Sequence, residues 1–404
     1  MSIPVLDAKG GVYTLVWEEE QLVAKLTRLR EHSDYSVSAE IKLVSTSPVG
    51  GHLHQAKLTL TSTAAQKTLA KHLSERLNTI DWPAIIEQAS VKVLTEYRKG
   101  EPPIEVGKML VREHLAYRVA PLVVEARPTL IYGPGGSLKS FFATYLSVLV
   151  DLAKSENGLD VEKGKVLYLD YETSQDEFRD RVQMIHHGLN VSTPSTILYR
   201  YCTRPLAAEV EELQEMVAEH AVNMVVVDSV GSACAGETEG KAEFILTMFS
   251  ALRSLRCTSL LIDHTNKEGI LYGTIYKYNQ SRCVWELKRQ HELDTDHVHI
   301  GLVHRKINTG TLLRTIGFEA SFGGDEEVAF SRYDATALDD IAATLSIKDQ
   351  LRRALRDGKK KREALAELTG LKDATIKTIL YRHRDRAGGF ILMGEDWGLF
   401  DASR

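Results

Sequence analysis

The stretch LIYGPGGSLKSFF, residues 130–142, combines glycines, a lysine and a hydroxyl side chain in an order that suits phosphate binding. The pattern G-x-x-x-x-G-K-[S/T] is matched except at its second glycine, where Leu138 stands. In such a loop, backbone N–H groups point at phosphates, the lysine reaches the terminal phosphates and the hydroxyl binds Mg²⁺. The stretch predicts a site for ATP and Mg²⁺ formed by Gly133, Pro134, Gly135, Gly136, Ser137, Leu138, Lys139 and Ser140.

This chemistry needs a strand, a loop and a helix in succession, and the sequence supplies that order. PTLIY at 128–132 has the pattern of a buried strand, and SFFATYLSVLVDLAK at 140–154 has that of a helix. We expect Leu138 to take a helix-like conformation, which a leucine side chain tolerates. The alternative for the loop alone is an accidental glycine-rich turn.

Three further apolar runs end in polar residues that a phosphate site requires. Ligands bind at the carboxyl ends of strands in an open parallel sheet, so these residues should lie beside the loop. Glu172, after KVLYLDY, would orient or deprotonate water, and Asp228, after VNMVVV, would hold Mg²⁺ with Ser140. His264, after SLLID, would sense the γ-phosphate or contact a neighbouring subunit. The alternatives are a helix-start acid at Glu172 and a structural histidine at His264.

Composition and periodicity predict several domains in an α/β chain. The 404 residues are 43% hydrophobic and 26% charged, which suits two or three domains. Apolar strands alternating with helices over 121–335 indicate a parallel sheet covered on both faces. Residues 1–100 suggest a small α+β domain, with helices expected at 18–32 and 63–78, and 101–120 a proline-containing linker. Residues 342–404 would form a separate C-terminal domain.

The remaining bulk features exclude some classes of protein. Four cysteines without metal-ligand spacing argue against a zinc site, and His52 and His54 lack a third ligand nearby. We found no secretory signal and no apolar run long enough to cross a membrane, so we expect a cytoplasmic protein. The net charge of -5 does not itself indicate a nucleic-acid partner.

Residues 120–325 resemble the RecA-like ATPases of the RepA type, a plasmid and phage replicative helicase family related to DnaB. The resemblance rests on the loop at 133–140, LDYETS with Glu172, the strand ending in Asp228, and HTNK from His264 to Lys267. It implies ATP hydrolysis by a ring, most simply a hexamer, with single-stranded DNA passing through it. It also implies a cation that reaches a neighbouring subunit's nucleotide, with the candidates Arg305, Lys306 and Arg282.

The C-terminal segment resembles a winged helix. Three helical stretches are followed by GGFILMGEDWGLF, which suggests two strands around a turn. Residues 341–404 hold 14 Lys and Arg against 9 Asp and Glu, so this segment is basic. The third helix would contact duplex DNA through Lys372, Thr375, Lys377, Arg382 and Arg384. Winged helices also serve as protein-interaction modules, which is the alternative.

The leading hypothesis is an ATP-driven DNA helicase or translocase in replication of a plasmid, phage or mobile element. A DNA-binding ATPase switch, which assembles through the winged helix without unwinding, is the alternative from another class. An inactive nucleotide-binding scaffold, suggested by Leu138, is a third.

Overall fold

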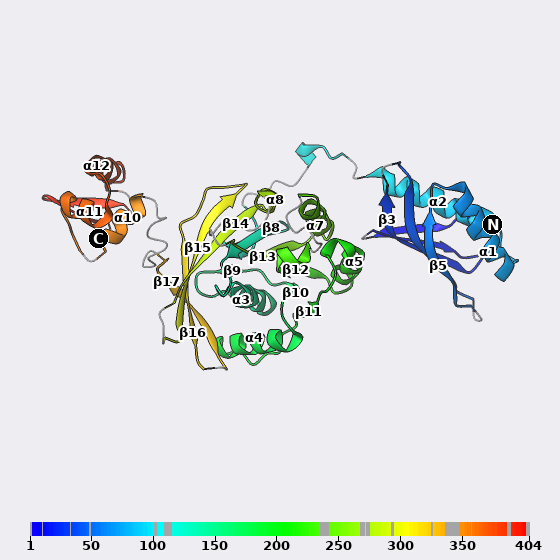
Figure 1. Ribbon diagram of the computed structural model, residues 1–404, viewed down its shortest axis with the longest axis horizontal. Helices are drawn as coiled ribbons and strands as arrows, with labels where there is room; N and C mark the ends of the chain where they lie inside the picture. Colours follow the sequence, from blue (N-terminus) through cyan, green and yellow to red (C-terminus); the bar gives the residue numbers. More distant parts are fainter. Residues whose placement is uncertain are drawn as a thin grey trace. The chain divides into compact units, whose positions relative to one another are not determined.

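The computed structural model describes residues 2–9, 11–32, 34–47, 50–100, 103–108, 115–234, 242–266, 271, 275–291, 295–324, 326–335, 347–356, 358–385 and 389–400. The chain divides into two compact units, and Figure 1 labels their helices and strands. The first comprises Met1–His114 with Ala207–Ala221 and Ala251–Leu255, and the second comprises the remainder.

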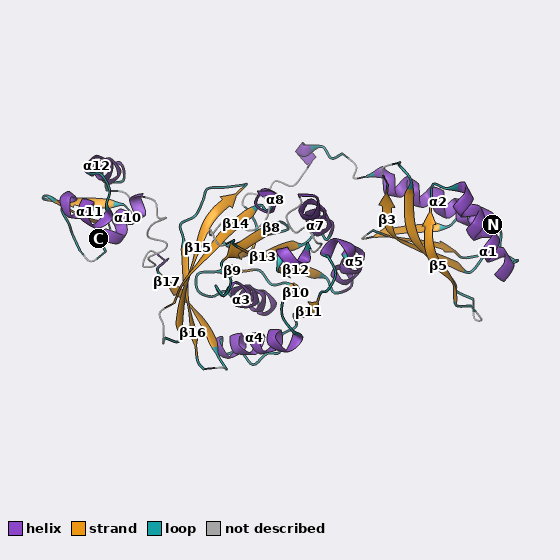
Figure 2. Cartoon of the chain, in the orientation of Figure 1, coloured by secondary structure: helices purple, strands orange, loops and turns teal. Residues whose placement is uncertain are grey.

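The N-terminal part is an antiparallel sheet with two helices (Figure 2). Its sheet order follows the chain: β1 (Val5–Lys9), β2 (Val12–Trp17), β3 (Leu22–Glu31), β4 (Val37–Ser45) and β5 (His52–Thr59). The helices are α1 (Thr63–Arg76) and α2 (Trp82–Lys99). Ser62 and Asp81 cap their first turns by accepting hydrogen bonds from backbone N–H groups. A short 3₁₀ turn, η1 (Val106–Lys108), lies in the segment expected to be a linker.

The helix expected at 18–32 is wrong, because β3 occupies this segment. Leu22, Ala24 and Leu26 alternate with more exposed residues and are fully buried, which is the period of a strand. The segment is rich in helix-forming residues, but pairing with β2 and β4 on both sides outweighs that local preference.

The second unit is built on a nine-stranded sheet in the order β11, β10, β12, β13, β8, β14, β15, β16, β17. Its strands are β8 (Pro128–Gly133), β10 (Lys165–Asp170), β11 (Leu198–Tyr201), β12 (Val222–Asp228), β13 (Thr258–His264), β14 (Cys283–His291), β15 (His297–Ile307), β16 (Ile316–Phe322) and β17 (Val328–Tyr333). The six strands from β11 to β14 are parallel. This arrangement confirms the expected α/β class.

The parallel strands are apolar on both faces. Met224 and Val226 of β12 belong to the core that contains α3 (Lys139–Leu152), while the alternating Val225 and Val227 are equally buried. α3 packs against β10, β12 and β13, and α4 (Gln175–Gly188) packs against α3 and β17. α6 (Val230–Ala233) packs against β12 and β13. Burial on both faces explains why these strands read as continuous apolar runs.

An antiparallel extension widens the sheet beyond what the sequence suggested. β15, β16 and β17 follow β14 in antiparallel pairing. Phe318 of β16 and Phe330 of β17 contact the ring of Phe142 in α3, so the extension packs against α3. The other elements are β6 (Tyr117–Ala120), β7 (Val123–Val124), β9 (Asp160–Val161), η2 (Leu206–Ala208), α5 (Val210–Glu219), α7 (Ala242–Ser254) and α8 (Ile275–Gln280).

The C-terminal module contains three helices and a hairpin around a small apolar core. They are α10 (Ile347–Ala354), α11 (Arg362–Thr369), α12 (Asp373–Arg382), β18 (Phe390–Met393) and β19 (Asp396–Leu399). Gly370 ends α11 with a φ of 67°, a left-handed conformation that suits glycine. Trp397 and Phe390 of the hairpin pack with Leu351, Leu365 and Leu380 of the helices.

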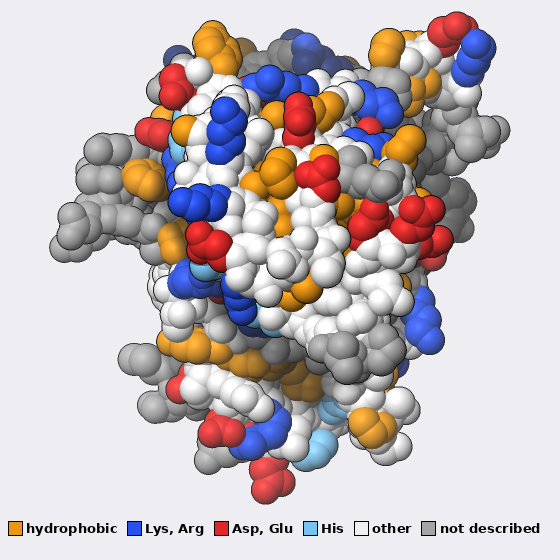
Figure 3. All heavy atoms as spheres, turned by 90° about the vertical axis from the view of Figure 1, so that its right-hand side faces the viewer, with side chains coloured by type: hydrophobic (Ala, Val, Ile, Leu, Met, Phe, Trp, Pro, Cys, Tyr) orange, Lys and Arg blue, Asp and Glu red, His pale blue; other side chains and the backbone are white. Residues whose placement is uncertain are grey.

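Among the described residues, no helix is both long and apolar enough to cross a lipid bilayer. On the face shown in Figure 3, basic and acidic side chains are interspersed, with hydrophobic side chains scattered between them. This mixture is the ordinary pattern of a solvated surface.

Candidate nucleotide site

The phosphate loop (residues 133–140) connects the carboxyl end of β8 to the start of α3. Pro134, Gly135 and Gly136 are exposed, whereas Ser137 and Lys139 are buried. The Lys139 ammonium donates to the Pro134 carbonyl at 2.6 Å and lies 3.3 Å from Ser137 Oγ. The loop therefore folds around the Lys139 side chain, while Pro134, Gly135 and Gly136 remain exposed and accessible to a ligand.

Leu138 takes a different conformation from the one expected. Its φ of 66° and ψ of 17° are left-handed, not helix-like. Glycine is the residue that adopts this region without steric cost, which explains why the motif has glycine here. The leucine side chain is half-buried and packs against the core around α3. Burial of this side chain offsets the backbone cost.

Asp228 ends β12, and its carboxylate is buried. The Tyr168 hydroxyl donates to Asp228 Oδ2 at 2.8 Å. Burial raises the pKa of Asp228, and the hydroxyls of Ser140 and Tyr168 only partly offset this effect. Asp228 Oδ1 accepts no hydrogen bond of good geometry from the described residues. A buried carboxylate oxygen without a donor fits a cation, which Ser140 and Asp228 would share.

Glu172 and His264 meet from two different strand ends. Glu172 Oε1 lies 3.1 Å from His264 Nε2 and also accepts a hydrogen bond from the Ser229 hydroxyl. The hydrogen bond from His264 is the main reason that the pKa of Glu172 is lowered. Asp170 holds the turn that carries Glu172, because its Oδ1 accepts from the backbone N–H groups of Glu172 and Thr173 at 2.9 Å each. Glu172 is thus held ionised, with a third of its side chain exposed.

A buried ion pair beneath these groups was not foreseen. Asp263 of β13 and Lys277 of α8 lie 2.8 Å apart, with 2% and 1% of their side chains exposed. Burial raises the pKa of Asp263 despite the partner ammonium. Lys277 gave no sequence signal, because its contact with Asp263 depends on how α8 folds back against β13.

The carboxylates at the strand ends share one electrostatic environment with Lys139. Burial lowers the pKa of Lys139, while Asp228, Glu172 and Asp263 act in the opposite direction. Parallel pairing explains this convergence, since β10, β12, β13 and β8 are adjacent and end at the same edge. His264, for example, pairs with Gly133 in the sheet.

Part of this chain matches a known family of domains. Residues 108–269 match the family model described as an AAA domain. The match supports a P-loop ATPase domain in this part of the chain. No curated protein matches the chain. Among solved structures, a KaiC-like protein from the hyperthermophilic archaeon Pyrococcus horikoshii is similar at 16% identity with a TM-score of 0.40, covering 54% of this chain and 94% of that one.

Of the three candidate finger cations, Arg305 and Lys306 lie on β15 and Arg282 directly precedes β14. The Arg305 guanidinium donates to Glu286 Oε2 through Nε at 2.6 Å. Lys306 Nζ donates to the carbonyls of Tyr278, Asn279 and Ser281 at 2.8–3.0 Å, which end α8. Arg282 is exposed, and its guanidinium makes no hydrogen bond or ion pair with the described residues. Lys267 lies outside the described residues.

The expected DNA contacts lie on or beside α12. Lys372, Lys377, Arg382 and Arg384 are exposed, and Thr375 is partly buried. Arg384 lies 3.1 Å from its neighbour Asp385. The other three cations form no ion pair within the described part of the chain. They would therefore be available to a polyanion.

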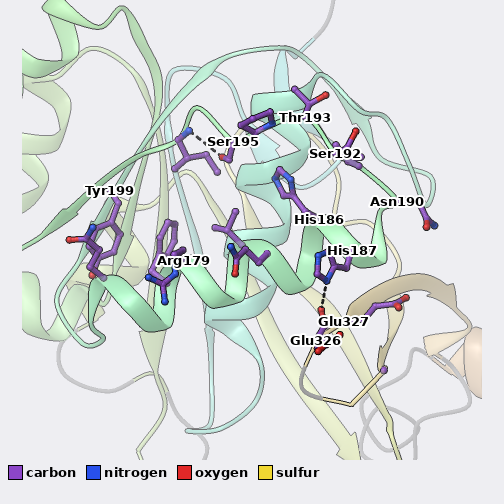
Figure 4. A pocket seen from close by; sticks show the side chains of 18 residues that line it. Arg179, His186, His187, Asn190, Ser192, Thr193, Ser195, Tyr199, Glu326 and Glu327 are labelled. Atoms are coloured by element: carbon purple, nitrogen blue, oxygen red, sulfur yellow. Dashed lines mark hydrogen bonds between the residues drawn. The ribbon is translucent and has the colours of Figure 1, made fainter.

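A groove beside α4 is separate from the phosphate loop. It has a volume of about 980 Å³ and runs along α4 (Figure 4). His186, Ser192 and Thr193 line one side of it, and His187 contacts the Glu326 carbonyl at 2.8 Å on the other. The groove includes no residue of 133–140, so we do not assign nucleotide to it.

His52 and His54, the two histidines considered for a metal, lie on β5. The rings of His54 and His72 lie 5.3 Å apart. The described residues contain no group of three or more His, Cys, Asp or Glu side chains that could hold a metal ion.

Proposed function

We propose that the chain is an ATP-driven motor that acts on DNA as an oligomer, in replication of a plasmid, phage or mobile element. The observation that carries this proposal is the convergence of Lys139, Asp228, Glu172 and His264 at one edge of the sheet. Each belongs to a different strand end or loop, and together they supply the groups that phosphoryl transfer needs.

Each residue has a distinct task in this proposal. Lys139 moves from the Pro134 carbonyl to the terminal phosphates, and the loop N–H groups hold the phosphate oxygens. Ser140 and Asp228 would hold Mg²⁺, which neutralises charge developing on the phosphates. Glu172 orients the attacking water and accepts its proton, while His264 couples the position of Glu172 to the state of the nucleotide.

The proposed oligomer follows from the cation that completes the site. Arg282 precedes β14, which runs parallel to β8, so it lies at the edge opposite the phosphate loop. A guanidinium there reaches a nucleotide only on another subunit. We therefore favour Arg282 over Arg305 and Lys306 as the finger, since those two have partners within the chain. A closed ring, most simply a hexamer, satisfies this arrangement at every subunit.

Glu172→Gln tests the catalytic assignment. The variant should lower turnover by about 10²–10⁴-fold, because the amide cannot accept the proton. ATP binding should persist, since Lys139 and the loop are unchanged. The measurements are steady-state ATPase and nucleotide titration. Glu177→Gln, in the first turn of α4, is the matched control. Unchanged hydrolysis in the Glu172 variant would remove the assignment.

Strand displacement on a forked DNA substrate tests the motor. We expect ATP-dependent unwinding that the Glu172 variant lacks, together with ATPase activity stimulated by single-stranded DNA. Native mass in the presence of nucleotide would report the oligomer.

A DNA-binding ATPase switch is the second candidate, and the exposed cations on α12 favour it. A switch would bind duplex DNA through Lys372, Lys377 and Arg382 in a salt-dependent way but would not unwind a fork. Replacing these three cations by alanine should abolish duplex binding in either case, so only the unwinding assay separates the two functions.

A further inference from the structure

Arg289 is a second cation at the phosphate loop. It lies near the end of β14, where Leu287, two residues earlier, faces the core that contains α3. Because side chains alternate along a strand, Arg289 lies on the same face, at a level of the sheet where β14 still pairs with β15 but the pairing with β8 has ended. Its Nη1 donates to the Gly136 carbonyl at 2.5 Å.

β14 contacts the loop at both ends of its turn. A Cβ added at Gly133 would come within 2.4 Å of the Leu287 carbonyl oxygen, so the strand leaves room only for glycine there. Three residues later, Gly136 takes a φ of 67° and meets Arg289. β14 therefore contacts the first half of the loop through its backbone and the second half through the guanidinium of Arg289.

The charge of Arg289 is not neutralised within the described residues. It forms no ion pair with them, and its Nε is shielded from solvent without a hydrogen-bond partner. A guanidinium has five N–H donors, and the Gly136 carbonyl accepts from one nitrogen only. An uncompensated cation beside a phosphate loop suits an anionic ligand on the same subunit.

We infer that Arg289 is a positioning residue of this chain's own nucleotide site, which holds the Gly136 turn in its phosphate-binding shape. This inference rests on the proposed ATPase site. It differs from the finger, since Arg289 acts on the loop of its own subunit while Arg282, at the other end of β14, faces away from it. Loss of Arg289 should weaken nucleotide binding more than it slows the chemical step.

The test uses the full chain and magnesium ADP, followed by titration of a fluorescent ADP analogue. Arg289→Ala should raise Kd by about 10- to 100-fold, the effect of losing a hydrogen bond from a charged group. Arg289→Lys should recover part of this loss, because an ammonium also donates to a carbonyl. In ATPase assays KM should rise while kcat at saturating ATP stays within about threefold of wild type.

Lys288→Ala is the matched control, since its side chain lies on the opposite face of β14, 4.0 Å from Glu286. It should leave Kd unchanged, and both alanine variants should unfold at the wild-type temperature. Wild-type affinity in Arg289→Ala would overturn the inference while leaving the ATPase site intact. Equal losses in the two alanine variants would also overturn it, as a purely structural effect. A wild-type chain that fails to bind magnesium ADP would overturn both this inference and the proposed function.

Discussion

Cations lie at both ends of the parallel strands in the ATPase domain, but their surroundings differ. At the carboxyl ends, the carboxylates of Asp228, Glu172 and Asp263 act on Lys139, and one oxygen of Asp228 accepts no hydrogen bond of good geometry from the described residues. Near the amino ends, Lys306 donates to three carbonyls, two in the last turn of α8 and one directly after it. Polar groups left unsatisfied mark a place built for a ligand, whereas saturated ones mark a structural contact.

The comparison also separates three cations that look equivalent in the sequence. Arg305 is bound to Glu286 and Lys306 to the end of α8, so each stabilises the chain that carries it. Within the described part of the chain, Arg282 forms hydrogen bonds only through its backbone, to Pro128 and Asn308. This difference is the reason for proposing Arg282 as the cation that acts on a neighbouring subunit.

Removing Arg282 should have the largest effect. Arg282→Ala should lower turnover by about 10³-fold or more, the usual worth of an arginine finger. Its unfolding temperature should match wild type, because the side chain has no partner in the described chain. Steady-state ATPase at concentrations that permit assembly measures the first effect, and thermal melting measures the second.

A mixing experiment shows whether the cation acts between subunits. Arg282→Ala subunits keep an intact loop, and Lys139→Ala subunits keep the finger, so mixing the two inactive variants should restore part of the turnover. Rescue of Arg305→Ala instead of Arg282→Ala would place the finger at Arg305.

Removing Lys306 should act on stability. Lys306→Met leaves the carbonyls of Tyr278, Asn279 and Ser281 without their shared donor and should lower the free energy of unfolding by about 1–3 kcal/mol. Lys306→Arg, which can still donate, is the control in urea titrations. A large fall in turnover with unchanged stability would contradict the structural role.

Asp228→Asn tests the unsatisfied carboxylate. Because burial raises the pKa of Asp228, the ionised form costs stability in the ligand-free chain. Protonation of Asp228 adds to the stability of the folded chain at a pH below about 3.8, the pKa of this group in the unfolded chain. This added stability is lost as the pH rises through the higher pKa that Asp228 has in the folded chain. At pH 7 the ligand-free variant should therefore be more stable than wild type, by about 1 kcal/mol.

This difference should shrink as the pH falls through the pKa of Asp228. The stabilisation that magnesium nucleotide gives to wild type should be absent in the variant. Thermal melts with and without EDTA, over a pH series, measure both effects. A ligand-free variant less stable than wild type at pH 7 would show that the carboxylate is satisfied.

Leu138→Gly should have the smallest effect. Glycine relieves the left-handed backbone, worth about 1–2 kcal/mol, but removes the packing of the leucine side chain. The net change in stability should stay below about 1 kcal/mol, with nucleotide affinity within about threefold of wild type. Ala153→Gly is the control, because Ala153 is left-handed and exposed and should gain stability. The scaffold alternative survives only if wild type is inert and Leu138→Gly restores turnover.

The sequence by itself determined the order of elements around the nucleotide site. Strand, loop and helix at 128–152, and acids at the ends of buried strands, follow from local periodicity and from the rule that parallel strands end at one edge. The α/β class and the P-loop ATPase domain could be predicted on this basis. Both depend on patterns within a few tens of residues.

Tertiary structure decided the rest, because it depends on which segments pair. The segment 18–32, which was expected to be a helix, contains β3, because it pairs with β2 on one side and β4 on the other. Lys277 and Arg289 reach the site only because α8 and β14 return to β13 and β8 from later in the chain. Likewise, only the fold shows that Arg305 binds Glu286 and that Lys306 binds the end of α8, while Arg282 is exposed. These partners lie about twenty or more residues away in the sequence, and no spacing rule predicts such a contact.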